Sequence, residues 1–365
     1  MARLIALLIV ASLGTGCAWI PRSYVNRADH SEKTEFELVD GSPMYRLIPR
    51  GWISPVDRPR FVDAADVDFL QDEEPVIVVE HAGQTRVYST WYLDGHEVVN
   101  DTIGDKHLAV TWCPLVQAGV VFEREVDGRA LRLQASGRLW RDALVMYDRQ
   151  TKSHWTQHGG KALLGPSADA GVVLPMHPSG RTTWANAKVR HPDARVLVKK
   201  ANLLGGGTAT IYDSYLERTD QLGIFGTHLS DDRLPGKALV IGFVRPESAY
   251  ALSIEGLGQG VAMSVGGDPV FAHALPGGED GRVWHRTDAA GSRLRDLTVA
   301  SDGMTVVDTG TGERWDAVSG KPVDGAHEAL RGEPGHVVYW FAWQQNHPES
   351  RVWAGESLQD PRAPG

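Results

Sequence analysis

An internal repeat constrains the fold of this chain more than any other feature of its sequence. The segment 147–165 matches the segment 307–325 with one constant offset, so that Trp155 corresponds to Trp315. Further identities fall at the same spacing: Asp148 and Asp308, Thr151 and Thr311, Gly160 and Gly320, Lys161 and Lys321, Gly165 and Gly325. Self-similarity of this kind indicates that related structural units follow one another along the chain. We therefore expect two diverged copies of one folding unit in tandem.

The match extends beyond this segment and sets the expected domain organisation. Residues 76–79 align with 238–241, and residues 184–192 align with 340–348. The predicted organisation is, in chain order, a signal peptide (1–17), an irregular N-terminal extension (18–71), repeat copy one (72–201), a connecting segment (202–234) and repeat copy two (235–355). The connecting segment is rich in aromatic residues, which a free linker would not need, so we expect it to pack on the repeat copies.

Each copy has the pattern of a mainly β structure. Short apolar runs such as 76–80 and 107–113 alternate with turn residues, which is typical of a sandwich or barrel. Asp127-Gly128 stands between two further runs and predicts a tight hairpin, because glycine accepts positive φ. The fold class we expect is therefore mainly β, with two tandem diverged copies of a β sandwich- or barrel-like unit.

A short helix is expected to end each copy. Thr182 or Thr183 is a suitable cap, and Pro192 closes the segment. Between them, Trp184, Ala187 and Lys188 follow one another at helical spacing. Residues 340–346 should repeat this helix in copy two.

Residues that occur in both copies are most simply explained as scaffold. Trp155 and Trp315 are expected in the core. Asp148 and Asp308 are expected to hold hairpin turns through side-chain bonds to the backbone. Asp148 is therefore interpreted as structural rather than as a catalytic acid.

The N-terminus has the order of residues found in secretory signal peptides. Arg3 is followed by the apolar run 4–13, and small residues lead into Cys17. This order resembles a bacterial lipoprotein signal, in which the cysteine is lipidated, although Gly14 stands where leucine is usual. The run is about half of the ~20 residues that a membrane span needs. We expect an exported protein that is periplasmic or tethered to a membrane through a lipid at Cys17, with simple secretion as the alternative.

Composition excludes some partners and draws attention to one thiol. The net charge is −9, and no block of Lys or Arg is present, so a nucleic-acid partner is not expected. The chain has 2 cysteines, and if Cys17 is lipidated then Cys113 has no disulfide partner in the chain. Cys113 is either a reactive thiol or a small buried core residue.

A polar constellation is confined to copy one. It comprises the run from His96 and Glu97 to Asn100 and Asp101, together with Cys113, His154 and His158. Paired carboxylates serve as acid and base or bind cations, and a nearby imidazole favours a reactive thiolate. The candidate catalytic residues are Cys113, His96, Glu97 and Asp101, and the candidate metal ligands are Cys113, His96 and His154. Zn or Cu would suit His and Cys donors. The alternatives are an ordinary turn, surface histidines and a core cysteine.

Four motifs in order resemble the bacterial "domain of unknown function 3179" family. They are the segments 72–77, 96–101, 111–115 and 146–151, and the resemblance covers roughly residues 72–353. Family members typically have Trp-His-Glu where this chain has Gly95-His96-Glu97, and Cys-Pro-Leu-Cys where this chain ends the motif with Val116. The resemblance implies the location of a site and points to thiol redox chemistry. A dithiol mechanism, however, needs a second thiol to resolve a mixed disulfide, and this chain has Val116 in its place.

Two hypotheses follow. The first is an exported cell-envelope protein with a thiol or metal site around Cys113 and His96, supported by Glu97 and Asp101. The second is a non-catalytic envelope lipoprotein that binds a protein or small-molecule partner. The sequence has no Gly-rich phosphate loop, nucleophile elbow or dinucleotide fingerprint.

Overall fold

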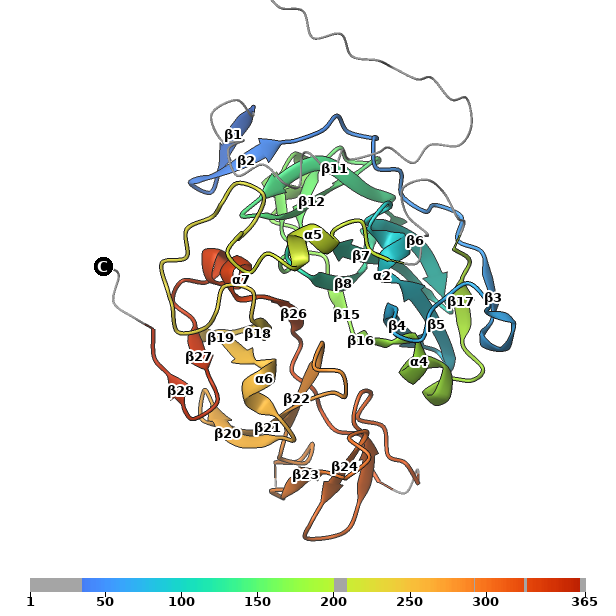
Figure 1. The fold of residues 1–365 in the computed structure, drawn as a ribbon, viewed down its shortest axis with the longest axis vertical. Coiled ribbons are helices and arrows are strands. Elements are labelled where there is room, and N and C mark those ends of the chain that lie inside the picture. The colour runs from blue at the N-terminus through green and yellow to red at the C-terminus, as the bar shows by residue number, and fades with distance from the viewer. Residues whose placement is uncertain (1–34, 200–208, 292, 325–326, 362–365) are drawn as a thin grey trace, which may run out of the picture.

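A computed structural model describes residues 35–199, 209–291, 293–324 and 327–361, and it is mainly β. The predicted signal peptide and Cys17 lie outside the described residues. The first half of the chain forms the upper part of the molecule in Figure 1 and the second half forms the lower part. Within the described ranges, no helix is both long enough and apolar enough to cross a membrane.

In the first half, the residues that the structure describes form three larger antiparallel or mixed sheets and one small hairpin. The first sheet has the order β1 (Phe36–Val39), β2 (Ser42–Arg46), β11 (Leu133–Trp140), β12 (Ala143–Asp148), β13 (His154–Thr156), β14 (Ala162–Leu164). The second has the order β15 (Met176–His177), β8 (Ala118–Glu123), β7 (Lys106–Cys113), β6 (Val98–Ile103). The third has the order β16 (Gly180–Thr183), β4 (Pro75–His81), β5 (Gln84–Ser89), β17 (Arg195–Leu197), β3 (Phe61–Asp63). The hairpin joins β9 (Glu125–Val126) and β10 (Arg129–Ala130).

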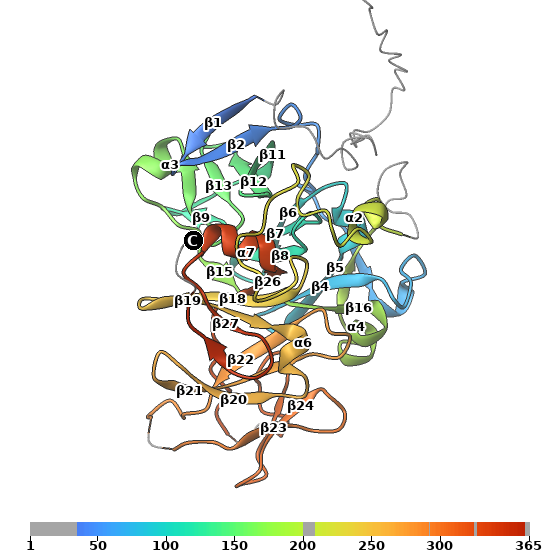
Figure 2. The ribbon, with the colours of Figure 1, turned by 60° about the vertical axis from the view of Figure 1, so that its left-hand side comes forward.

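The described residues of the second half form three sheets. Their orders are β26 (His336–Tyr339), β18 (Leu239–Arg245), β19 (Ser248–Ser253), β27 (Arg351–Trp353), β28 (Leu358–Gln359); then β20 (Val261–Val265), β21 (Asp268–Ala274), β22 (Gly281–His285); then β23 (Leu297–Val299), β24 (Thr305–Asp308), β25 (Arg314–Asp316). Figure 2 shows these sheets stacked below those of the first half.

The two halves share an order of strands and directions. β4 pairs antiparallel with β5 and β16, and β5 pairs parallel with β17. β18 pairs in the same way with β19 and β26, and β19 pairs parallel with β27. Val76 lies opposite Ser89 and Val240 lies opposite Ser253, so Ser89 corresponds to Ser253. In the structure Val76 therefore corresponds to Val240, whereas the sequence alignment of 76–79 with 238–241 is shifted from this correspondence by two residues.

Short helices connect these strands. They are the 3-10 turn η1 (Ala64–Asp66) and the helices α2 (Thr90–Leu93), α3 (Pro166–Asp169), α4 (Trp184–Arg190), α5 (Asp213–Leu216), α6 (Ile254–Leu257) and α7 (Trp340–Asn346). The sequence predicts α4 and α7 correctly, and Thr183 caps α4 by accepting a hydrogen bond from the amide of Asn186. Neither helix ends its half, because β17 follows α4 and β27 follows α7.

The turn and core predictions agree with the structure. Asp127 and Gly128 both have positive φ and join β9 to β10. Trp155 and Trp315 are fully buried. Asp148 Oδ1 accepts from the amide of Thr151, and its Oδ2 accepts from Trp155 Nε1 at 3.0 Å, so the carboxylate holds both a turn and a core side chain.

The segment expected as an irregular N-terminal extension is partly regular. Its residues 36–46 form the hairpin of β1 and β2, and β2 pairs with β11, while β3 pairs with β17. These strands complete sheets whose other members come from residues 75–197, so their pairing depends on distant partners. A local pattern of polar residues and prolines does not reveal that pairing.

One hydrophobic core spans both halves of the chain. It joins Cys113 and Phe122 of the first half to Trp340 and Trp343 on α7, with Tyr215 of the connecting segment. The amide of Tyr339 donates to the carbonyl of Val116 at 2.9 Å and fixes α7 against the end of β7. The described part of the connecting segment is thus packed against both halves.

Candidate functional site

A loop between α2 and β6 brings Glu97 beside the end of β7. The amide of Glu97 donates to the carbonyl of Leu93 at 2.7 Å, and the carbonyl of Glu97 accepts from the amide of Trp112 at 2.9 Å. Glu97 has φ of 57°, a conformation that costs energy for residues other than glycine and is common at functional sites. Because Trp112 precedes Cys113 on β7, this pairing sets Glu97 next to the thiol.

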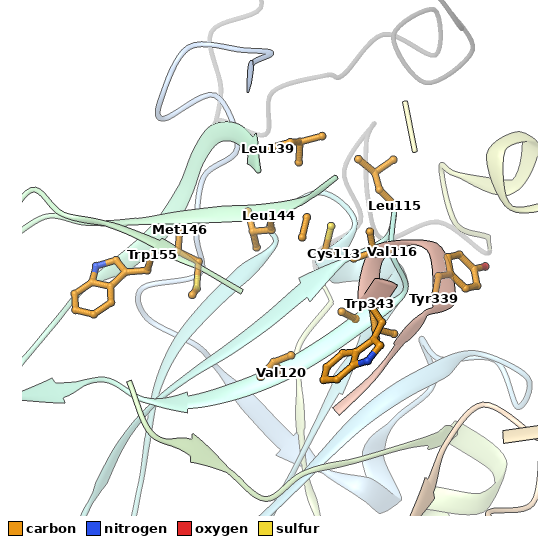
Figure 3. Packing of buried hydrophobic residues seen from close by; sticks show 14 of the residues in the cluster. Cys113, Leu115, Val116, Val120, Leu139, Leu144, Met146, Trp155, Tyr339 and Trp343 are labelled. Atoms are coloured by element: carbon orange, nitrogen blue, oxygen red, sulfur yellow. The ribbon is translucent and has the colours of Figure 1, made fainter. Parts of the chain in front are cut away.

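Cys113 is a buried residue of the main core. Its side chain is 1% exposed, and Figure 3 shows its sulfur among Leu144, Val116 and Leu115, above α7. Burial and the nearby Glu97 carboxylate raise the pKa of the Cys113 thiol to about 12. The thiolate is the reactive form, so this environment makes the thiol inert at neutral pH.

Glu97 and Asp94 are acidic groups held in a low-dielectric environment. Burial, reinforced by the Asp94 carboxylate, raises the pKa of Glu97 to about 8. Burial also raises the pKa of Asp94 to about 7, although Trp112 Nε1 donates to Asp94 Oδ1 at 2.8 Å and the Thr210 hydroxyl donates to Oδ2. Glu97 is therefore largely protonated at neutral pH.

Tyr212 completes this group from the connecting segment. Its ring is 2% exposed, and burial together with Glu97, Asp94 and Cys113 raises the pKa of Tyr212 well above its usual value. Glu97 and Tyr212 line a small cavity of about 50 Å³. Aliphatic side chains form most of its remaining wall: Leu47, Ile48, Ile53, Leu115, Leu139, Leu144 and Ile224.

His96 has different partners from Cys113. Its Nδ1 lies 2.7 Å from the carbonyl oxygen of Ser54, and its ring packs on Tyr92 with centroids 4.5 Å apart. Burial lowers the pKa of His96. The pKa of the Cys113 thiol is shifted by burial, the Glu97 carboxylate and nearby backbone groups, whereas the ring of His96 lies against Ser54 and Tyr92.

Asp101 lies in a second polar group, apart from Glu97. Tyr88 Oη donates to Asp101 Oδ2 at 2.7 Å, and the amide of Thr102 donates to Oδ1 at 2.8 Å. Asp101 lines an open cleft of about 800 Å³ together with Asn100 and Arg124. The charged neighbour that acts on Glu97 is Asp94, so the expected pair of Glu97 and Asp101 does not form.

The expected metal ligands do not converge. His154 lies on β13 against the ring of Tyr147, and burial lowers its pKa to about 4. Among the described residues, no group of three or more His, Cys, Asp and Glu side chains is arranged to hold a metal ion.

His158 forms a contact between the halves that the sequence did not reveal. Its Nδ1 lies 3.1 Å from Nε2 of His336, and both side chains are buried. Burial lowers the pKa of His336 to about 4 and that of His158 well below its usual value. The pair is therefore neutral at pH 7. Only the packing of β26 against β8 of the first half in three dimensions identifies it.

A large cavity lies at the seam between the two halves. Its volume is about 470 Å³, and its wall combines β4, β8 and β16 with β18, β22 and β26. Asp280 Oδ2 accepts from the amide of Arg181 at 2.6 Å, and Arg282 donates to the carbonyl of Ser179 at 3.0 Å, so polar bonds cross the seam beside the cavity. Lys321 and Glu80 form a further ion pair across it.

Comparison with known proteins gives one match. The family model described as "Protein of unknown function (DUF3179)" matches residues 50–350. The chain belongs to this family. No curated protein and no solved structure matches it.

In this DUF3179 protein, two of the segments that carry the resemblance meet in space. Glu97 comes from the segment 96–101 and Cys113 from the segment 111–115, and they lie within electrostatic range of each other. Val116, at the place of the second cysteine, is fully buried, and its carbonyl is bonded to Tyr339. The sequence patterns did not indicate Asp94 and Tyr212 as members of this site. The aromatic content of the connecting segment was the available signal for Tyr212, whereas nothing in the sequence distinguishes Asp94 from a turn residue.

Proposed function

We propose that this protein is an exported binding protein of the cell envelope, and that its ligand occupies the cavity between the two halves. The observation that carries the proposal is that cavity of about 470 Å³. Its volume falls within the range of roughly 300–1,000 Å³ that is usual for small-molecule sites, and such sites occur preferentially at interfaces between domains.

The character of the cavity wall supports a small amphipathic ligand. Apolar side chains such as Ile241, Val283 and Trp284 line part of it, while Arg181 and Glu333 supply charge. A largely apolar wall with a few placed polar groups is the usual composition of a ligand site.

The surroundings of Cys113 support binding over thiol or metal catalysis. A catalytic thiol needs access and a lowered pKa, whereas Cys113 is 1% exposed and its pKa is raised to about 12. The hypothesis of a thiol or metal site at Cys113 and His96 would instead need a rearrangement that opens the core.

We also propose that the two halves are diverged copies of one unit. The identical strand directions in the two five-stranded sheets support this, as does the position of α4 and α7 directly after β16 and β26. Met146 pairs with Trp155 and Val306 pairs with Trp315. The constant offset of the sequence repeat therefore also holds for the strand pairing. A cavity at the seam between copies is then a feature that neither copy could form alone.

The proposed location rests on the N-terminal sequence. The apolar run before Cys17 favours export, and a lipid at Cys17 would tether the folded part to a membrane surface. A binding protein held in this way needs no membrane-spanning segment.

The test of the binding proposal is a ligand-observed NMR screen with a fluorinated fragment library. Ser179→Trp fills the cavity from the wall at β16, and Ser301→Trp adds the same side chain at an exposed position in the second half. We expect fragments that bind the wild type and Ser301→Trp and that are excluded by Ser179→Trp. Fragment binding that is identical in all three proteins, or absent from the wild type, would contradict the proposal.

A further inference from the structure

The open cleft of the first half has a volume of about 800 Å³ and a mainly polar wall. Two of the segments that carry the family resemblance meet there, since Asn100 of the segment 96–101 and Gln150 of the segment 146–151 both line it. Neither segment contributes to the cavity between the halves. That cavity therefore leaves the polar groups of these two segments without a role.

Both carboxylates that line the cleft already have an arginine partner. Asp57 Oδ2 accepts from Arg149 Nη1 at 2.6 Å. Asp101 Oδ2 accepts from the hydroxyl of Tyr88 at 2.7 Å and lies 3.9 Å from Arg86 Nε. The negative charges of the wall are thus balanced without the other arginines of the cleft.

Arg124 contributes a buried positive charge to the same wall. It is 7% exposed, and its guanidinium donates to the backbone carbonyls of Leu108 at 3.0 Å, Leu131 at 2.6 Å and Asp101 at 3.0 Å. A guanidinium has five N–H donors, so two remain without a partner among the residues that the structure describes. Within the same residues Arg124 forms no ion pair with a carboxylate. A buried charge normally has a counter-ion, so this one indicates that an anion can bind.

Arg132 adds a second positive charge beside the first. Arg124 Nη1 bonds the carbonyl of Leu131, the residue directly before Arg132, and both arginines line the cleft. Arg132 is exposed, and its side chain forms no ion pair in the described ranges. Burial lowers the pKa of Arg124, Asp101 raises it, and the like charge of Arg132 lowers it further. An anion that contacts both guanidinium groups would relieve this repulsion.

The two neighbouring charges limit the kind of anion. A phosphate monoester carries a charge of about −2 above pH 7 and has three acceptor oxygens on one phosphorus atom. The planar fork of arginine N–H donors matches phosphate oxygens well. A carboxylate brings a single charge and would balance only one of the two arginines.

We propose that this cleft binds a phosphate monoester of a small hydroxylated molecule, with its phosphate group between Arg124 and Arg132. Thr102, His107 and Gln150 also line the cleft and suit hydroxyl groups in the rest of the ligand. The volume of about 800 Å³ lies within the range of roughly 300–1,000 Å³ that is usual for small-molecule sites. The cleft is separate from the cavity between the halves, so this inference does not depend on the proposed function.

Isothermal titration calorimetry of the purified protein in HEPES buffer at pH 7.5 tests the inference. The probe is glycerol 3-phosphate, and the comparisons are glycerate, which keeps the hydroxyl groups with one negative charge, and uncharged glycerol. We expect glycerol 3-phosphate to bind, glycerate to bind at least tenfold more weakly, and glycerol to give no heat of binding.

Two variants and one control assign the binding to the cleft. Arg132→Gln should weaken the binding of glycerol 3-phosphate about tenfold, which corresponds to one hydrogen bond between charged groups, and Arg124→Gln should weaken it at least as much. Arg314→Gln changes an exposed arginine on β25 of the second half and should leave the affinity unchanged. Because Arg132 is exposed, its variant decides the matter even if Arg124→Gln does not fold. Absence of binding to the wild type, equal binding of glycerate, an unchanged affinity in Arg132→Gln, or an equal loss in Arg314→Gln would overturn the proposal.

Discussion

The buried contact between His158 and His336 predicts that the free energy of unfolding falls at acidic pH by an amount that can be calculated. The folded-state pKa of His336 is about 4, and an unfolded histidine titrates near 6.5. The unfolded state therefore binds a proton that the folded state rejects, so stability is complete above about pH 6.5 and is lost as the pH falls towards 4. From these two values, the exclusion of a proton from His336 should lower the free energy of unfolding by about 2 kcal/mol at pH 5 and by about 0.2 kcal/mol at pH 7.

Other groups titrate over the same range, so the wild-type profile alone does not isolate His336. The raised pKa of Glu97 acts in the opposite direction, because its stability cost grows as the pH rises from about 4.5 to 8. His158 and His347 face His336 and are also disfavoured in their charged forms. A comparison of a variant with the wild type at each pH cancels these contributions to first order.

The measurement is urea unfolding of the wild type and His336→Gln at pH 7 and pH 5. The loss of unfolding free energy between these pH values should be about 2 kcal/mol smaller in the variant. His107→Gln, at a partly exposed histidine bonded to Thr102 at 3.0 Å, is the control and should follow the wild type. If His336→Gln loses as much stability as the wild type on acidification, the reasoning from burial is wrong.

Three further predictions concern the thiol, the scaffold and the anchor. Cys113 should react with a disulfide reagent about a thousandfold more slowly in the native protein than in urea at pH 8, because a thiol of pKa about 12 is hardly ionised there; equal rates would show that the thiol is accessible. Trp155→Ala and Trp315→Ala should each lower the free energy of unfolding by about 3–5 kcal/mol in urea titrations, since both rings are fully buried, and a loss below 1 kcal/mol for either would contradict a core role. Cys17→Ser should move the protein from the membrane to the soluble fraction on cell fractionation, and unchanged membrane association would argue against lipidation.

The features that sequence reasoning predicted well are those set by local chemistry. Asp127-Gly128 forms its hairpin because of the φ values its residues accept, and α4 begins where Thr183 caps it. The hairpin of β1 and β2 was missed because its partner β11 lies about ninety residues further along the chain. Local patterns carry no information about such a partner.

The composition of the candidate site shows the same limit. Asn100 and Asp101 follow His96 and Glu97 closely in sequence, but Glu97 lies in the loop before β6 with φ of 57°, so the alternation of side chains along β6 does not extend to it. Asp101 therefore reaches Tyr88, while Glu97 turns towards Cys113 and Tyr212.

Tyr212 shows why the candidate site could not be completed from residues 72–201 alone. It belongs to the connecting segment and lies about a hundred residues beyond Cys113. The core that encloses it also takes Trp340 and Trp343 from the second half of the chain. Cys113 is part of this core, and burial raises the pKa values of both its thiol and the Glu97 carboxyl. The thiol that looks reactive in the sequence is therefore buried partly by later elements of the chain, and that burial makes it inert at neutral pH.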